Sequence, residues 1–296
     1  MFLLVPTVTV TLSQIHSLQS NSLTALTPIG LDTLTIFMSS FQRQDLSNDG
    51  EECYKPTSTN FRPRYTGPPP NEMTSQQLYL RETILATRPH TGLSGPFGPW
   101  LSTPAIASPS QELGRVVRYE TSLSRRESEL VILLTGAKFQ SETEFDLHVG
   151  EARRAGVGWD VIRSIPRGIV VSSFQPVAID AGKDATQLEK FNFERVRKNV
   201  IPLLIQEHDD MQPLSEEGVA TMARENAKER EVAIVLFAAE LLDSNSVSDE
   251  TYATTRQTLG GDDAALVEIT AIVGYYAYVS YTLNVFQIPS SEVAPI

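Results

Sequence analysis

A glutamate and a histidine stand four residues apart in the segment FQSETEFDLH, residues 139–148. On an α-helix, Glu144 and His148 would lie one turn apart on the same face, where a carboxylate can orient an imidazole. Histidine suits acid/base chemistry because its ordinary pKa is about 6.5. The pair therefore predicts a proton-transfer site. The same segment has the form S-x-x-E from Ser141, which predicts a capping box and gives Glu144 an alternative, structural role.

A third candidate, Glu129, lies nineteen residues before His148. In one unbroken helix this separation would be roughly 28 Å, at about 1.5 Å per residue. Glu129 can reach His148 only if the chain turns between them, and Gly136 followed by a helix start at Ser141 provides a place for that turn. We interpret Glu129, Glu144 and His148 as the catalytic residues, with a hydrogen-bonded structural histidine as the alternative.

Substrate binding is assigned to arginines and aromatic residues. The chain has a formal net charge of −12, so an anionic substrate would need a local cation. Arg118 and Arg126 precede Glu129 and are predicted to supply it, with ion pairing to nearby glutamates as the alternative. Four aromatic residues are predicted to line an apolar pocket, with core packing as the alternative for each: Phe97, Trp100, Phe139 and Phe145.

Composition narrows the class of protein. The chain has 296 residues, of which 41% are apolar and 20% charged, as in soluble globular proteins. Its acidity argues against nucleic-acid binding and favours small molecules or other proteins as partners. Cys53 is the only cysteine, which excludes an internal disulfide and a cysteine-based zinc site. The four histidines are scattered, so we expect no structural or catalytic metal.

Apolar periodicity and turn residues predict an all-α chain. The predicted caps are Thr74, Ser108 and Ser124, and Pro202 weakens one helix. The last helix is apolar enough for a bundle interior or a subunit interface. The GPPP motif at residues 67–70 predicts a linker or a strap over the domain. Helices are expected over residues 74–88, 108–122, 124–139, 141–156, 158–165, 188–210, 215–245 and 262–286.

The N-terminal segment is predicted to be a poorly ordered extension over residues 1–60. Its first twelve residues, MFLLVPTVTVTL, are apolar, but no Lys or Arg occurs before Arg43 and the run is too short to span a bilayer. We therefore expect no membrane association and a cytoplasmic location. A targeting role, or a native start at Met38, is the alternative. A helical domain over residues 61–290 and a tail over 291–296 complete the predicted organisation.

An ungapped superposition of residues 129–149 on residues 265–285 suggests an internal repeat. It matches apolar residues such as Leu130 with Leu266, and places His148 on Asn284. Glu144 then falls on Ser280 and Glu129 on Ala265. The superposition predicts a helical bundle of two related halves, with the polar groups kept in one of them.

Several segments together resemble the carboxymuconolactone decarboxylase family, a branch of the alkylhydroperoxidase D-like proteins. They are SETEFDLHVGEARRAGVGWDVIRSI, RYETSLSRRESELVILL, GPFGPWLSTPAIA and LVEITAIVGYYAYVSYTLNVFQIP, within residues 74–288. The resemblance implies an all-α fold, a homo-oligomer, commonly a trimer or hexamer, and a cofactor-free active site near the E-F-x-x-H segment. Residues 167–225 are longer than the usual connection between the halves, which leaves the family's founding substrate in question.

In the peroxidase branch of that family, a glutamate lies nineteen residues before the histidine, and two cysteines lie seven and four residues before it. The corresponding residues here are Glu129, Ser141 and Glu144. Without the cysteines, thiol peroxidase chemistry is not expected. The resemblance implies a cofactor-independent lyase acting on a small carbonyl, lactone or aromatic-derived acid. The alternatives are a lyase or isomerase of specialised metabolism that does not decarboxylate, and a non-catalytic binding or scaffold protein.

Overall fold

A computed structural model describes residues 63–88, 92–168, 189–210 and 218–290. These residues fold into helices and form no strand, which confirms the predicted all-α class. They belong to one compact unit, Cys53–Ile296. The predicted N-terminal extension, the C-terminal tail and parts of the 167–225 insertion lie outside the described residues.

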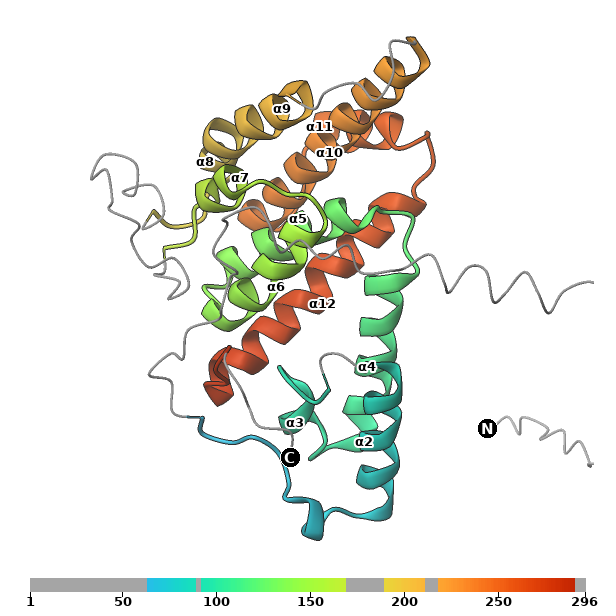
Figure 1. The fold of residues 1–296 in the computed structure, drawn as a ribbon, viewed down its shortest axis with the longest axis vertical. Coiled ribbons are helices and arrows are strands. Elements are labelled where there is room, and N and C mark those ends of the chain that lie inside the picture. The colour runs from blue at the N-terminus through green and yellow to red at the C-terminus, as the bar shows by residue number, and fades with distance from the viewer. Residues whose placement is uncertain (1–62, 89–91, 169–188, 211–217, 291–296) are drawn as a thin grey trace, which may run out of the picture. The chain divides into compact units, whose positions relative to one another are not determined.

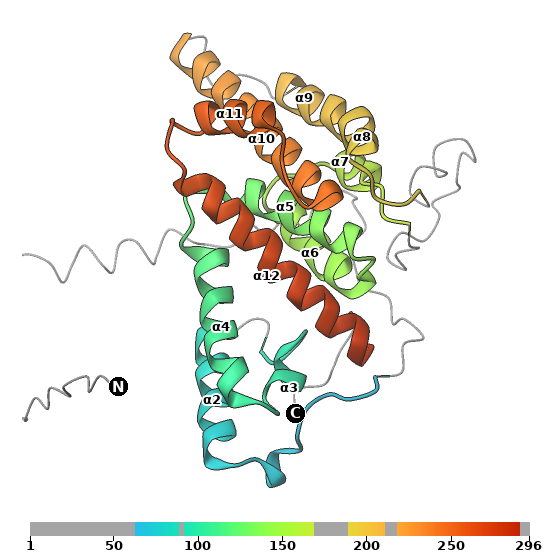
Figure 2. The same ribbon diagram turned by 180° about the vertical axis from the view of Figure 1, so that it is seen from behind.

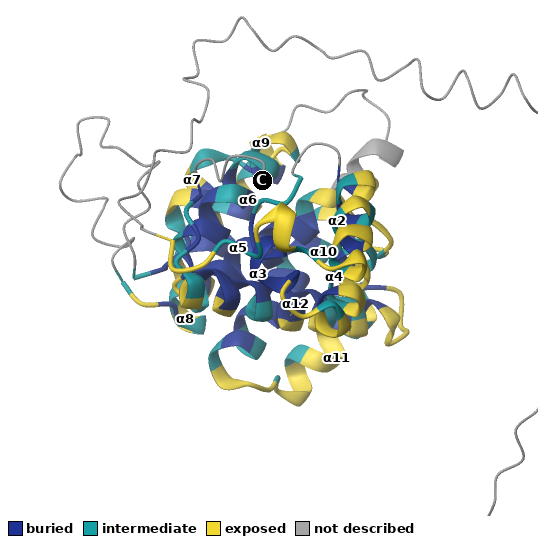
Figure 3. Cartoon of the chain, turned by 90° about the horizontal axis from the view of Figure 1, so that it is seen from below, coloured by how far each residue is buried: buried dark blue, intermediate teal, exposed yellow. Residues whose placement is uncertain are grey.

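Three helices pack closely at the centre of this unit: α5 (Arg125–Lys138), α6 (Glu142–Arg154) and α12 (Ala264–Phe286). Every residue of α5 from Glu127 to Ala137 is buried, so this helix has no solvent face. Figures 1 and 2 show α12 running diagonally past α5 and α6 from both sides. Seen from below in Figure 3, the buried residues concentrate on these central helices.

A tight turn between α5 and α6 brings the two helices side by side. Gln140 adopts a left-handed conformation, with φ of 50°, and the Ser141 N–H donates to the Gly136 carbonyl over 2.9 Å. A Cβ on Gly136 would lie 3.2 Å from the backbone nitrogen of Phe145, so glycine allows a close approach of the helices. The predicted turn between Glu129 and His148 is confirmed.

Two outer groups of helices flank this centre. One consists of α2 (Ser75–Thr87), α3 (Phe97–Trp100) and α4 (Pro104–Tyr119). The other consists of α7 (Trp159–Ser164), α8 (Phe193–Arg195), a π-helical turn η3 (Val196–Val200), α9 (Ile201–Asp210), α10 (Gly218–Ser244) and α11 (Asp249–Thr258). The π turn ends just before Pro202, whose nitrogen has no hydrogen to donate to the preceding turn. The predicted weakening of this helix therefore occurs at this point.

The predicted helix caps have different outcomes. Thr74 and Ser124 cap their helices, as predicted, and in the structure each forms a capping box. The prediction for Ser108 is wrong because α4 begins at Pro104, whose fixed φ and missing N–H suit a first helical position. The prediction of a capping box at Ser141 is also wrong, because the Ser141 side chain makes no cap hydrogen bond. Helix α11 was not predicted, since few of its residues are buried.

The predicted internal repeat is not seen in the register that suggested it. Residues 129–149 form two helices joined by a turn, whereas residues 265–285 lie within the single helix α12. The apolar matches therefore pair segments of different structure. They arise because both segments are buried and rich in aliphatic residues, which limits their composition.

Helix α12 is the one helix in the described part of the chain whose length and apolar composition would allow it to cross a membrane. Half of its most apolar window is nevertheless buried inside the protein. Its packing against α4, α5 and α6 provides a direct reason for its apolar sequence.

The segment 63–69 forms the predicted strap. The Arg64 N–H donates to the Phe286 carbonyl at the end of α12, over 2.8 Å. A Cβ on Gly67 would lie 2.4 Å from the Gly98 carbonyl oxygen, and one on Gly98 would lie 2.0 Å from the Thr66 carbonyl oxygen. The strap and α3 are thus in backbone contact, which only glycine permits on both sides.

Replacing Gly98 by Ala should therefore destabilise the protein by about 1–3 kcal/mol, the usual cost of overpacking. Urea unfolding followed by circular dichroism measures this change. Gly274→Ala is the control, because a Cβ there meets nothing within 4 Å, and an added methyl in a helix should stabilise by roughly 0.5–1 kcal/mol. Equal effects of the two substitutions would contradict the backbone contact.

Candidate functional site

His148 lies between two carboxylates in the protein interior. Its Nδ1 is 2.6 Å from Glu129 Oε2, a buried hydrogen bond between α6 and α5. Its Nε2 is 3.2 Å from Glu144 Oε1, within ion-pair distance. The three side chains are nearly inaccessible to solvent, at 7%, 1% and 3% exposure for His148, Glu129 and Glu144. The structure therefore brings together all three predicted catalytic residues.

The two carboxylates have different environments. Glu129 accepts the His148 hydrogen bond, and its other oxygen is 3.4 Å from the Arg125 guanidinium. Glu144 Oε1 is buried and has no aligned hydrogen bond to any described residue, despite its contact with His148. Glu129 is thus held in place by the protein, whereas Glu144 keeps an acceptor oxygen available.

These carboxylates determine the protonation of His148. Burial by itself disfavours the charged imidazolium, but Glu129 and then Glu144 outweigh that effect and raise the pKa of His148 to about 9. The folded protein therefore holds a buried imidazolium at neutral pH. An imidazolium has a proton to donate, which is the property of a general acid.

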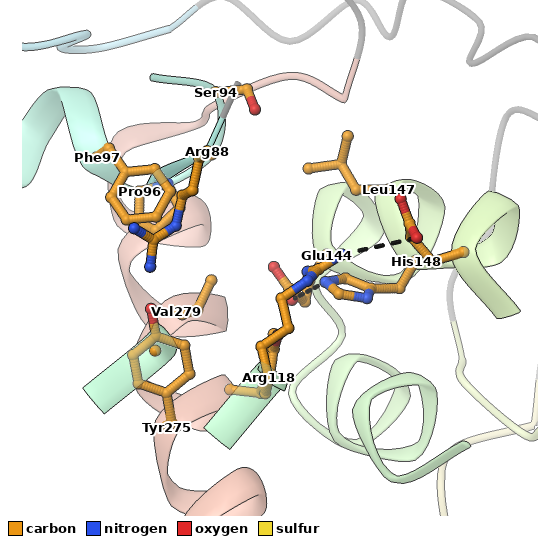
Figure 4. Close-up of a pocket in the computed structure, with 14 residues that line it drawn as sticks. Arg88, Ser94, Pro96, Phe97, Arg118, Glu144, Leu147, His148, Tyr275 and Val279 are labelled. Atoms are coloured by element: carbon orange, nitrogen blue, oxygen red, sulfur yellow. Dashed lines mark ion pairs between the residues drawn. The ribbon is translucent and has the colours of Figure 1, made fainter. Parts of the chain in front are cut away.

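A cavity of about 110 Å³ lies beside this array (Figure 4). A single water needs only about 10–15 Å³ by this kind of measure, so the cavity has room for a small molecule. In Figure 4, Arg88, Phe97 and Tyr275 lie on one side of the view and Leu147 and His148 on the other, with Arg118 and Glu144 between them. Ser94, Gly95, Pro96, Gly114, Glu151, Tyr276 and Val279 complete the lining.

Helix α12 supplies two tyrosines to this cavity. The Tyr276 ring contacts the His148 ring edge to face, with centroids 5.2 Å apart, and Tyr275 packs against Tyr276 in the same manner. Burial raises the pKa of both phenols above the ordinary value, so both remain neutral hydroxyls. A Cβ on Gly114 would lie 2.1 Å from the Tyr275 hydroxyl oxygen. Glycine in α4 therefore makes space for this tyrosine.

Two arginines reach the cavity. Arg118, on α4, lies 3.8 Å from Glu151 and makes no aligned hydrogen bond through its buried Nε. Arg88, at the end of α2, donates to the side-chain and backbone oxygens of Gln111 over 3.2 Å and 2.9 Å, and lies 4.5 Å from the centroid of the Phe97 ring. The cavity thus combines cations with the acid/base array.

The structure separates the predicted substrate-binding residues into two groups. Arg118 and Phe97 line the cavity. Trp100 does not line it but packs against Phe97, stacks on Tyr278 and donates a hydrogen bond to Thr282. Arg126 does not line it, because its guanidinium pairs with Glu231 and Glu207 and ties α5 to α10 and α9. Phe139 and Phe145 do not line it either, since they pack against Tyr281 and Arg167 respectively.

Sequence reasoning missed Arg88, Tyr275 and Tyr276. Arg88 was read as the end of a helix, where a cation is favourable for the helix dipole. The tyrosines were read as part of an apolar core helix, and their adjacency in GYYAY was the one signal that could have drawn attention to them. Buried tyrosines need hydrogen-bond partners or a polar cavity.

Among the described residues, no group of three or more His, Cys, Asp and Glu side chains is arranged to hold a metal ion. A second hollow in the described structure, at Glu194, Arg197 and Lys198, is a surface depression among exposed charged side chains. The cavity at His148 is therefore the better candidate for chemistry. In comparisons with protein-family models, curated proteins and solved structures, the chain matches none of them.

The carboxylates are expected to control the His148 pKa. Glu129→Gln should bring it from about 9 toward the ordinary value near ~6.5, and Glu144→Gln should lower it less because its contact is longer. NMR of ¹⁵N-labelled imidazole, measured against pH, reports both values. A pKa that stays near 9 in Glu129→Gln would contradict the arrangement.

The same pKa has a consequence for stability. Because it is raised in the folded state, protonation of His148 stabilises the fold fully below about pH 6.5. This contribution is lost as the pH rises through about 9.

Proposed function

We propose that this chain is a cofactor-independent enzyme similar to carboxymuconolactone decarboxylases, with an alkylhydroperoxidase D-like fold. Its substrate would be a small carbonyl compound, lactone or aromatic-derived acid. The observation that carries the proposal is the buried Glu129–His148–Glu144 array at the wall of a cavity. A structural histidine needs no such cavity, and the cavity also contains cations suited to an acidic substrate.

In the proposed reaction, the bond between the substrate and its carboxylate breaks and CO₂ leaves. The electron pair stays on the substrate as a dienolate or carbanion, and the His148 imidazolium donates a proton to that carbon. The neutral imidazole then regains a proton from solvent. Glu129 is hydrogen-bonded to Nδ1 of His148. The proton is therefore delivered from the other ring nitrogen, Nε2, which lies beside Glu144. A positioned acid of this kind contributes typically ~10²–10⁴-fold in rate.

Thiol peroxidase activity is not part of the proposal. The positions of the two cysteines in that branch are occupied by Ser141, which is buried, and by Glu144, which contacts His148. The single cysteine of the chain, Cys53, cannot form an internal disulfide. A carboxylate at position 144 instead favours proton chemistry.

An isomerase is the second candidate within enzymes. It is favoured by the available oxygen of Glu144, which could remove a proton from the substrate before His148 returns one. Product mass distinguishes the two reactions, because decarboxylation removes CO₂ and isomerisation leaves the mass unchanged. A non-catalytic scaffold remains the rival outside enzymes, and the cavity beside His148 counts against it.

The proposal also includes a cytoplasmic homo-oligomer, trimer or hexamer, that binds neither nucleic acid nor membrane. Large apolar side chains exposed on α12, namely Val267, Tyr281 and Val285, are suitable for a subunit contact. Size-exclusion chromatography with light scattering should then give three or six times the chain mass of 32.7 kDa. A mass of one chain would contradict the assembly without bearing on the chemistry.

His148→Gln should abolish turnover, because glutamine cannot donate a proton as an acid. The measurement is mass spectrometry of a source-cell metabolite extract incubated with wild-type or variant protein. His208→Gln is the matched control: His208 is also buried and lies 3.3 Å from Glu231, but it does not line the cavity. A metabolite that the wild type and His208→Gln consume, and that His148→Gln does not consume, supports the proposal. Consumption by His148→Gln at the wild-type rate would refute it.

A further inference from the structure

Arg88 is a buried cation that makes no ion pair with a described carboxylate, although the exposed Glu112 interacts with its charge from a distance. Its side chain is embedded beside Phe97, and its hydrogen bonds go to neutral acceptors, the Thr87 hydroxyl and the two oxygens of Gln111. Burial lowers its pKa from the ordinary value, but a guanidinium stays charged in proteins. Burying an unpaired charge is costly unless something else compensates it.

The other cavity cations are balanced differently. Arg118 faces Glu151 at 3.8 Å, and His148 lies between Glu129 and Glu144. Glu129, which does not itself line the cavity, also has Arg125 as a partner. Arg88 therefore differs from both, because no described carboxylate forms an ion pair with it.

Counting the charges on the cavity wall gives the sign of the missing partner. Three cations line it, Arg88, Arg118 and the His148 imidazolium, against two carboxylates, Glu144 and Glu151. The wall therefore has one excess positive charge, although the whole chain has a net charge of −12. An anionic ligand would compensate this excess.

The Arg88 side chain is held in position for such a ligand. Gln111 fixes the guanidinium through two hydrogen bonds, and Phe97 supports its face. A planar guanidinium held in this way can donate two parallel hydrogen bonds to a carboxylate. Figure 4 shows Arg88 and His148 on different sides of the view, so an anchored substrate could extend from one toward the other.

We propose that Arg88 binds a carboxylate of the substrate that stays on the molecule during the reaction, and that it thereby sets the specificity of this cavity. Gln111 is a positioning residue that acts through Arg88. The inference rests on the proposed function for what happens at His148, but ligand binding itself requires no turnover. It narrows the substrate to small carboxylates.

The test uses two probes of equal size, propanoate and propanamide, titrated into the full-length protein and followed by saturation-transfer NMR. The wild type should bind propanoate more tightly than propanamide. Arg88→Met should weaken propanoate binding by about tenfold or more, as expected when a charge-assisted hydrogen bond is lost. Arg88→Lys, which keeps the charge but loses the planar fork, should have an intermediate affinity.

Arg115→Met is the matched control, because it also removes one positive charge from the protein. Arg115 pairs with Glu112 on the exposed face of α4 and does not line the cavity, so propanoate affinity should stay at the wild-type value. Circular dichroism establishes that each variant is folded. Equal wild-type affinities for the two probes, or unchanged propanoate affinity in Arg88→Met or Arg88→Lys, would overturn the inference.

The binding test and the turnover test separate the two proposals. Selective propanoate binding that depends on Arg88, without any consumed metabolite, would leave the anion site standing and refute the enzyme. Turnover that depends on His148, together with propanoate binding that does not depend on Arg88, would support the enzyme and refute the anion site.

Discussion

The buried hydrogen bond between Glu129 and His148 is the interaction on which the site depends. It joins residues nineteen apart in the chain, so it exists only because Gly136 and Gln140 allow α5 and α6 to fold back on each other. Taking these charges out of water costs several kcal/mol per ion before their attraction is counted. The arrangement is therefore a poor way to stabilise a helix pair, and a good way to keep a proton at a defined place in a dry environment.

The helix α12 makes that environment dry. Its aliphatic side chains pack on α5, while Tyr275 and Tyr276 cover the imidazole and the cavity. Helix α3 contributes Phe97 to the cavity wall and is held from two sides: Gly67 of the strap meets Gly98 backbone to backbone, and Trp100 fixes α3 on α12 through Thr282. The low effective dielectric that results strengthens the action of Glu129 and Glu144 on His148. The packing around the array thus strengthens the control that the two carboxylates exert on the acidity of His148.

Sequence patterns predicted the parts of this structure that follow from local physics. Helical periodicity and the caps at Thr74 and Ser124 predicted most helices, and the four-residue spacing of Glu144 and His148 predicted their shared face. The same local reasoning failed at Ser141, because the Glu144 carboxylate faces the buried imidazolium and not the Ser141 backbone N–H. Arg88 and Tyr275 could not be found in this way, since they line the same cavity as His148 only through the tertiary packing of α2 and α12.

The protonation of His148 bears on which reaction such a site performs. A reaction that begins with proton abstraction needs a base that starts deprotonated, and with a pKa of about 9 the imidazole is largely protonated at neutral pH. A reaction that begins with loss of CO₂ needs an acid that is already charged when the carbanion forms, and His148 meets this requirement. An isomerisation would instead need Glu144 to act first, while its negative charge helps to keep His148 protonated. The electrostatics of the array therefore favour decarboxylation over isomerisation.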